Sequence, residues 1–219
     1  MINKLDNQLG GLIGAFALLL ISSCSPQHQA PVNLLFDIQP MNADGTLNAV
    51  IEIPAGTLAK YETSKETGEV IWSENSDGTK RTVDYLAYPA NYGMIPGTWL
   101  PANLGGDNDP LDVFVLGAAL ERGSIVRVRI VGVMHAIDSG QHDDKLIAVQ
   151  PSGAFSGVTD LNDLNRSYPG ALTILETWLT NYKRANSMHL AGTGSADTAY
   201  TIVRQAISAF ADFPAQAQQ

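Results

Sequence analysis

The sequence predicts an α+β domain with a small closed or nearly closed β-sheet and helices packed outside it. Short apolar runs that end at turn residues come first, and apolar residues at helical spacing come last. Strands followed by segregated helices are typical of α+β architecture. With 219 residues, 45% of them apolar, the chain is long enough to bury one sizeable core.

The strands are bounded by turn residues. The first ends at Pro54 and the second at the Asn, Asp and Gly residues of 75–78. Partial alternation of apolar and polar residues in 125–131 indicates a sheet with one wetter face. The expected strands are 49–53, 69–72, 111–116, 124–134 and 145–150.

Two helices are expected near the C-terminus. Pro169 and Gly170 fit the start of the first, whose apolar residues recur from Ala171 to Leu179. The same spacing predicts a second helix over 199–210.

The N-terminus resembles a secretory leader. Residues 11–21 are almost wholly apolar, too few to span a bilayer but suited to the apolar part of a signal peptide. Ser22-Ser23-Cys24 follows and resembles the lipobox of bacterial lipoproteins, although an ordinary signal peptide with an incidental cysteine is the alternative. We therefore expect a signal peptide over 1–23, a flexible tether over 24–46 that starts at a lipidated Cys24, and a folded domain over 47–213.

This leader implies export and lipid anchoring in a bacterial periplasm. Ser25 after the cysteine favours an outer membrane. The lone cysteine excludes an internal disulfide, so the core alone must hold the fold. A formal charge of −9, a pI near 4.7 and the lack of a basic run argue against nucleic acid as a partner.

An acidic cluster lies between Gly105-Gly106 and the apolar run 113–116. Asp107, Asp109 and Asp112 would repel one another unless a hard cation lay between them. The cluster therefore predicts a divalent-ion site, and its oxygen ligands favour Mg2+ or Mn2+ over zinc or copper. A plain turn with solvated acids is the alternative. An EF-hand calcium loop is disfavoured because Pro110 and Leu111 break its pattern.

The spacing of the charged residues sets a geometric condition. On a regular strand Asp109 and Asp112 would lie roughly 10 Å apart and face opposite sides, so the chain must bend for them to converge. Gly105, Gly106 and Pro110 are residue types that permit such a bend. Lys60 with Glu62, and Asp143 with Lys145, are two residues apart, which places each pair on one face of its strand.

Several blocks, in order, resemble the soluble family I inorganic pyrophosphatases, which hydrolyse pyrophosphate to two orthophosphates with magnesium. The match covers nearly all of residues 47–210. The blocks are 50–54 (VIEIP), 60–62 (KYE), 88–93 (YPANYG), 107–113 (DNDPLDV), 131–133 (VGV) with Asp138, Asp143 and Lys145, and the pair Tyr182-Lys183.

The resemblance implies a small OB-like closed β-barrel flanked by C-terminal helices, and it assigns roles. Asp109 would be the catalytic base that accepts a proton from the attacking water. The implied metal ligands are Asp107, Asp112, Asp138, Asp143 and Glu52. The implied substrate-binding residues are Lys60, Arg81, Tyr92, Lys145, Tyr182 and Lys183, with Glu62 and Tyr88 as supporting residues.

The expected function is Mg2+-dependent hydrolysis of pyrophosphate by in-line attack of a metal-bridged water, outside the cytoplasm. Seven acids against four bases leave a net charge of −3 on the expected site, so roughly three or four divalent ions would have to reverse its sign before a polyanion could bind. The alternative is a metal-dependent phosphate- or pyrophosphate-binding protein without turnover.

Some assignments stay open at this level. Lys80 could replace Arg81 as the phosphate contact, and a one-residue slip could exchange Asp143 and Asp144. Tyr88 and Tyr92, taken alone, could be ordinary surface rings. Relatives assemble as hexamers or dimers, so we expect a homo-oligomer of undecided size.

Overall fold

The computed structural model describes residues 32–183 and 188–213. The signal peptide over 1–23 and the lipidation of Cys24 lie outside the described residues and stay predictions. Within the described ranges, no helix combines the length and apolar character needed to cross a membrane.

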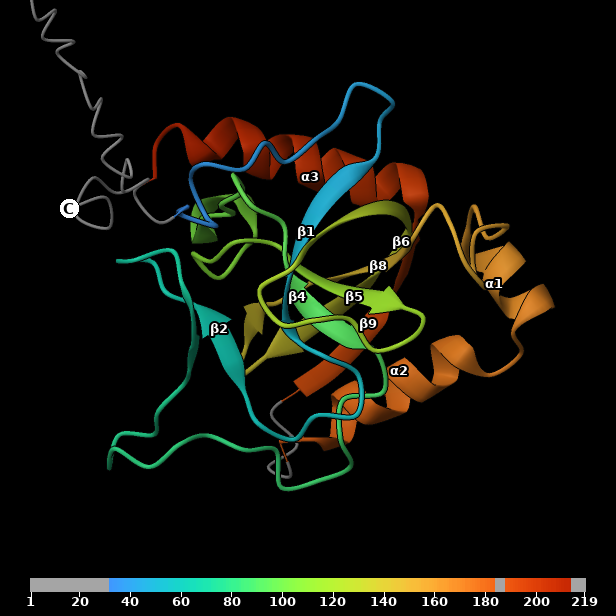
Figure 1. Cartoon of the computed structure of the whole chain (residues 1–219). Helices are drawn as coiled ribbons and strands as arrows, with labels where there is room; N and C mark the ends of the chain where they lie inside the picture. Colours follow the sequence, from blue (N-terminus) through green and yellow to red (C-terminus); the bar gives the residue numbers. More distant parts are fainter. Residues whose placement is uncertain (1–31, 184–187, 214–219) are drawn as a thin grey trace, which may run out of the picture. The chain divides into compact units, whose positions relative to one another are not determined.

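Five strands of the main sheet close into a barrel (Figure 1). The order is β1 (Leu47–Ile53), β4 (Asn91–Met94), β5 (Asp112–Leu116), β8 (Lys145–Val149) and β6 (Ile125–Asp138), and β6 pairs back with β1. All neighbours are antiparallel except β5 and β8, which run parallel. The predicted α+β fold with an OB-like closed barrel is confirmed.

The long strand β6 organises the rest of the sheet. It also pairs with the short β7 (Gln141–His142) and with β9 (Met188–Ser195). A separate hairpin, β2 (Tyr61–Thr63) with β3 (Val70–Trp72), stands beside the barrel. This hairpin forms one wall of a cavity that it shares with the barrel.

The helices cover the outside of the sheet (Figure 1). Helix α3 (Ala196–Phe210) buries Ala199, Val203 and Ala206 against the apolar face that includes Val128 and Val133. Helix α2 (Ala171–Asn181) packs Leu175, Trp178 and Leu179 into a second apolar cluster. Burial of these apolar faces contributes most of the stability of the two helices, because short isolated helices are marginally stable in water.

The expected strands and helices are confirmed to within a few residues. The sequence pattern did not predict several other elements. Strand β9 has the weak strand sequence MHLAGTGS, and it forms because its backbone pairs along the edge of β6. Helix α1 (Leu161–Ser167) begins at Asp160, whose side chain accepts a hydrogen bond from Asp163 N at 2.7 Å. Strands β2, β4 and β7 and the 3-10 turn η1 (Ala102–Leu104) are too short to show a period.

The predicted start of the folded domain at residue 47 is too late. Leu35 is fully buried and packs with Met94 and Phe213, while Phe36 contacts the ring of Phe210 with centroids 5.4 Å apart. Asn48 N also donates to Pro40 O at 2.9 Å. The apolar run 34–36 therefore ties the described part of the expected tether to the end of α3.

Candidate active site

A bulge in β1 determines where Glu52 points. The register between β1 and β4 shifts between Ile51 and Ile53, and bulges commonly redirect a side chain. The opposite strand makes room with Gly93, since a Cβ there would lie 1.8 Å from Val50 O. Thr63 N donates to Glu52 Oε1 at 2.6 Å, so Glu52 is buried but hydrogen-bonded.

The acidic loop before β5 is folded back on itself. Leu100 N donates to Asp109 O at 3.1 Å, and Asn108 N donates to Leu100 O at 3.0 Å. Gly106 allows this close approach, because a Cβ there would lie 2.1 Å from Leu100 O, and Asn108 adopts a left-handed conformation with φ of 66°. The bend that the Gly and Pro residues predicted is present, and Asp109 and Asp112 line the same cavity.

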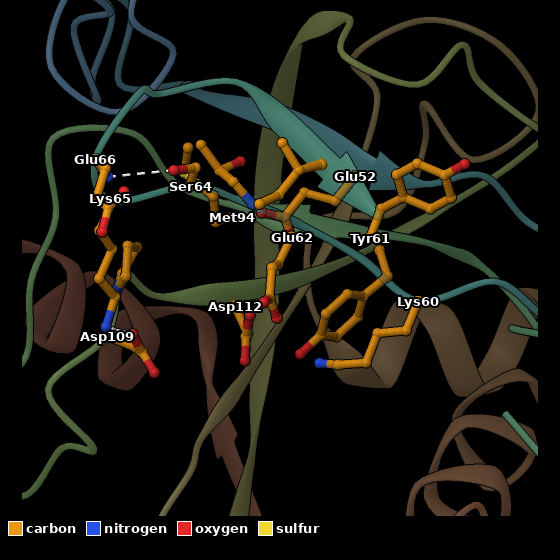
Figure 2. A pocket seen from close by; sticks show the side chains of 14 residues that line it. Glu52, Lys60, Tyr61, Glu62, Ser64, Lys65, Glu66, Met94, Asp109 and Asp112 are labelled. Atoms are coloured by element: carbon orange, nitrogen blue, oxygen red, sulfur yellow. Dashed lines mark hydrogen bonds and ion pairs between the residues drawn. The ribbon is translucent and has the colours of Figure 1, made fainter. Parts of the chain in front are cut away.

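That cavity has a volume of about 500 Å3 and lies between the barrel and the hairpin β2–β3 (Figure 2). Glu52, Tyr92 and Asp112 come from the barrel strands, and Asp109 comes from the loop before β5. Lys60 and Glu62 come from the hairpin side and line the same space, as their two-residue spacing predicts.

A second cavity of about 450 Å3 adjoins the first through Lys60. Arg81, Tyr182 and Lys183 line it, so most of its charge is positive. Lys80 lies elsewhere, with its ammonium 2.7 Å from Glu74 Oε1 on the exposed side of the hairpin. The geometry thus places Arg81, and not Lys80, at the second cavity.

Lys145 joins two of the expected metal ligands. Its ammonium pairs with both Asp112 and Asp143, and its side chain is 3% exposed. Burial alone would lower the pKa of Lys145, but the two carboxylates raise it well above its usual range. In this conformation the single positive charge of Lys145 offsets part of the negative charge of the two carboxylates.

Asp143 and Asp144 have different partners. Asp143 shares Lys145 with Asp112, whereas Asp144 Oδ2 lies 2.8 Å from His135 Nδ1. The geometry thus favours Asp143 over Asp144 beside Asp112. Asp138, at the end of β6, pairs with Lys183, which lines the second cavity.

The carboxylates raise one another's pKa. Burial, followed by the charges of Asp109, Asp112 and Asp143, raises the pKa of Asp107 to about 7. Burial and then Asp112 raise the pKa of Glu52 to about 7. Burial also raises the pKa of Asp109, although Lys65 acts in the opposite direction. Such a site favours added positive charge.

The chemistry of the donors, although not their present spacing, suits a hard divalent cation. Asp107, Asp112 and Asp143 line one small cleft and offer only carboxylate oxygens. In the described ranges no three His, Cys, Asp or Glu side chains are spaced to hold a metal ion. Lys145 lies between Asp112 and Asp143 instead. An ion bound between these carboxylates would therefore have to displace the lysine.

Aromatic rings support the wall behind the two cavities. Tyr182 stacks on Trp178 at 4.6 Å between ring centroids, Trp178 contacts Tyr88 at 4.4 Å, and Tyr88 contacts Tyr92 at 5.4 Å. Tyr88 and Tyr92 are buried, so the alternative of ordinary surface rings is wrong. Burial raises the pKa of Tyr92 well above its usual range, which keeps its hydroxyl a hydrogen-bond donor.

The sequence reasoning missed Lys65. This residue lies in the turn after β2, and its ammonium pairs with Asp109 Oδ1 and donates to Asn108 O at 3.2 Å. Residues 65 and 109 are far apart in the chain, so no local spacing could have indicated the contact. Only the position of the hairpin over the cavity creates it.

Comparison with known proteins identifies the family. The family model described as inorganic pyrophosphatase matches residues 49–211, which is most of the chain. The chain therefore belongs to the inorganic pyrophosphatase family, in agreement with the resemblance seen in its motifs.

Individual relatives agree with this assignment. The chain is 34% identical to the inorganic pyrophosphatase of Xylella fastidiosa, over 78% of this chain and 93% of that protein. It is 35% identical to the mitochondrial inorganic pyrophosphatase of Saccharomyces cerevisiae, over 63% of this chain but only half of the yeast protein. The crystal structure of a type I inorganic pyrophosphatase from Toxoplasma gondii superimposes with a TM-score of 0.79, at 25% identity, over 84% of this chain and 89% of that one.

Proposed function

We propose that this protein is an inorganic diphosphatase that hydrolyses pyrophosphate to two orthophosphates with Mg2+. The observation that carries the proposal is the junction of two cavities at Lys60, one lined by Glu52, Asp109 and Asp112 and the other by Arg81 and Lys183. A diphosphate has two charged ends, and this pair of compartments offers a separate environment to each.

The acids supply the metal-binding half of the site. Glu52 and Asp138 would complete a set centred on Asp107, Asp112 and Asp143, and Mn2+ is a possible substitute for Mg2+. When bound, the ions would supply the positive charge that a polyanion needs and would increase the acidity of water. Lys145, whose ammonium lies between Asp112 and Asp143, would then become available to phosphate oxygens.

The remaining residues hold and activate the reactants. Asp109 faces the first cavity, where its carboxylate accepts the proton of the attacking water. Lys60, Arg81 and Lys183 bind the phosphate oxygens and offset negative charge on the leaving group. Tyr92 and Tyr182 donate hydrogen bonds to the phosphate oxygens from the aromatic wall. Glu62 and Tyr88 support the site. In-line attack by water requires no covalent intermediate.

The reaction is tested by phosphate release from pyrophosphate, tripolyphosphate, ATP and an aryl phosphate, with Mg2+ and then with a chelator. Pyrophosphate is expected to be the preferred substrate, and chelation is expected to abolish turnover. Binding of pyrophosphate without release from any substrate would favour a receptor over an enzyme.

The role of Asp109 is tested by Asp109→Asn. This change removes the proton acceptor, so kcat is expected to fall by about 100-fold or more while the midpoint of thermal unfolding stays close to the parent value. Asp197→Asn, an exposed acid in the first turn of α3, is the matched control. Full activity of Asp109→Asn would refute its role as the base.

We further propose that the protein acts outside the cytoplasm, tethered through a lipid on Cys24, and that it forms a homo-oligomer. Support for the anchor comes from the apolar run 11–21 and the Ser22-Ser23-Cys24 sequence. Radiolabelled lipid should attach to the protein but not to Cys24→Ser. Recovery of unlabelled protein from the cytosol would exclude the anchor.

A further inference from the structure

The hairpin β2–β3 is attached to the barrel at its base. Thr63 N donates to the buried Glu52, and the Arg122 guanidinium lies 3.5 Å from the centre of the Tyr61 ring. Arg122 Nε also donates to Glu52 O at 3.1 Å, and Tyr61 stacks on Trp72. These contacts hold the start of the hairpin beside the bulge in β1.

Lys65 attaches the turn of the hairpin to the opposite wall. Its ammonium contacts the Asp109 carboxylate and the carbonyl oxygen of Asn108, two consecutive groups of the acidic loop. Figure 2 shows this side chain reaching Asp109, while Glu52 and Asp112 lie farther along the same cavity. The hairpin thus spans the cavity and is held at both ends.

The contact with Lys65 engages the side chain of Asp109, whose backbone is held separately. The backbone of Asp109 is held by Leu100 and by the Asp107 carboxylate, which accepts from Asp109 N at 3.2 Å. The Asp109 carboxylate itself has Lys65 as its partner in the described part of the chain. The two side chains are 44% and 48% exposed, so this ion pair contributes little to stability.

We propose that Lys65 is a positioning residue, whose ammonium holds the Asp109 carboxylate toward the cavity and ties the hairpin β2–β3 across it. The inference rests on the proposed function in one respect, which is that Asp109 acts as the base. A carboxylate that must take a proton from water at a defined position loses efficiency when it rotates away. Lys65 would therefore affect the rate of the chemical step more than the binding of substrate.

The test compares Lys65→Met, Lys65→Arg and the control Arg127→Met. The control removes an ion pair of similar exposure, between Arg127 in β6 and Asp44, neither of which lines the two cavities. Steady-state turnover of pyrophosphate with Mg2+ gives kcat and KM separately. Lys65→Met is expected to lower kcat by about tenfold with KM changed by less than about threefold.

The arginine variant separates positioning from a general loss of structure. Lys65→Arg keeps a cationic donor within reach of both partners and should recover kcat to within about threefold of the parent. Parent-like kcat in Lys65→Met, or failure of Lys65→Arg to recover a lost kcat, would overturn the proposal.

A second measurement does not depend on activity. Hydrogen exchange of the metal-free protein should be faster in Lys65→Met than in the parent, by about twofold or more, in segments 61–72 and 107–111, and unchanged there in Arg127→Met. A parent protein without turnover would refute the proposed function, and this exchange experiment would still decide the inference about Lys65. Unchanged exchange in Lys65→Met would refute it.

Discussion

Among the lysines that pair with carboxylates, Lys145 and Lys65 have very different surroundings. Lys145 lies inside the barrel wall between Asp112 and Asp143, whereas Lys65 reaches from a hairpin turn to Asp109 with almost half of its surface exposed. Breaking a buried pair leaves an uncompensated charge, while water readily replaces an exposed partner. The same pair of residue types therefore stabilises the barrel in one place and orients a single side chain in the other.

Removing the buried lysine should have the largest effect on stability. Lys145→Met removes the ammonium that Asp112 and Asp143 share, so the free energy of unfolding of the metal-free protein should fall by about 3–5 kcal/mol. Added Mg2+ should restore part of the loss, because a cation between the carboxylates replaces the ammonium.

Chemical denaturation with and without Mg2+ checks this prediction. Arg127→Met serves as the exposed control and should change stability by less than about 1 kcal/mol. If Lys145→Met and Arg127→Met lowered the free energy of unfolding equally, the buried pair would be no more important for stability than the exposed one.

The pH dependence of the free energy of unfolding should reflect the raised pKa values of the buried acids. Burial and the charge of Asp112 raise the pKa of Glu52 to about 7 in the folded protein, above the usual value of about 4.3. Between these values the folded state keeps a proton that the unfolded chain has released, so stability falls as pH rises through this window. Asp107, whose pKa is also about 7, acts in the same direction.

Denaturation of the metal-free protein at a series of pH values between about 4.5 and 7.5 measures this slope. Glu52→Gln should reduce the slope without abolishing it, because Asp107 remains. Stability that rises with pH over this window would contradict the assignment of raised pKa values to these two acids.

The smallest effect on stability is expected at the exposed lysine. Lys65→Met should change the free energy of unfolding by less than about 1 kcal/mol, since both side chains of the pair are well hydrated. A loss comparable to that of Lys145→Met, in the same denaturation experiment, would show that the hairpin contributes to the stability of the whole domain. A small loss of stability together with a reduced kcat would show that Lys65 acts on the site and not on the stability of the fold.

The main strands and helices, and many residues of the candidate site, could be predicted from the sequence. Strand and helix periods are local, so the strands β1, β5, β6 and β8 and the helices α2 and α3 could be predicted to within a few residues. Two-residue spacing also placed Lys60 beside Glu62, and the Gly and Pro residues around Asp107 indicated the bend in the acidic loop. Of the residues that the family motifs named, Glu52, Asp109 and Asp112 are among those that line the first cavity, and Arg81, Tyr182 and Lys183 line the second.

The contacts between segments that are distant in the chain could not be predicted, because they depend on the folded arrangement. Strand β9 pairs with β6, and residues 34–36 pack near the end of α3. Both contacts join segments that are far apart in the sequence. The contacts of Lys65 with Asp109 and of Lys145 with Asp112 have the same origin, because each lysine meets an aspartate that is distant in the chain. Local propensity specifies an element, but the free energy of a contact depends on burial and neighbours, which exist only in the folded protein.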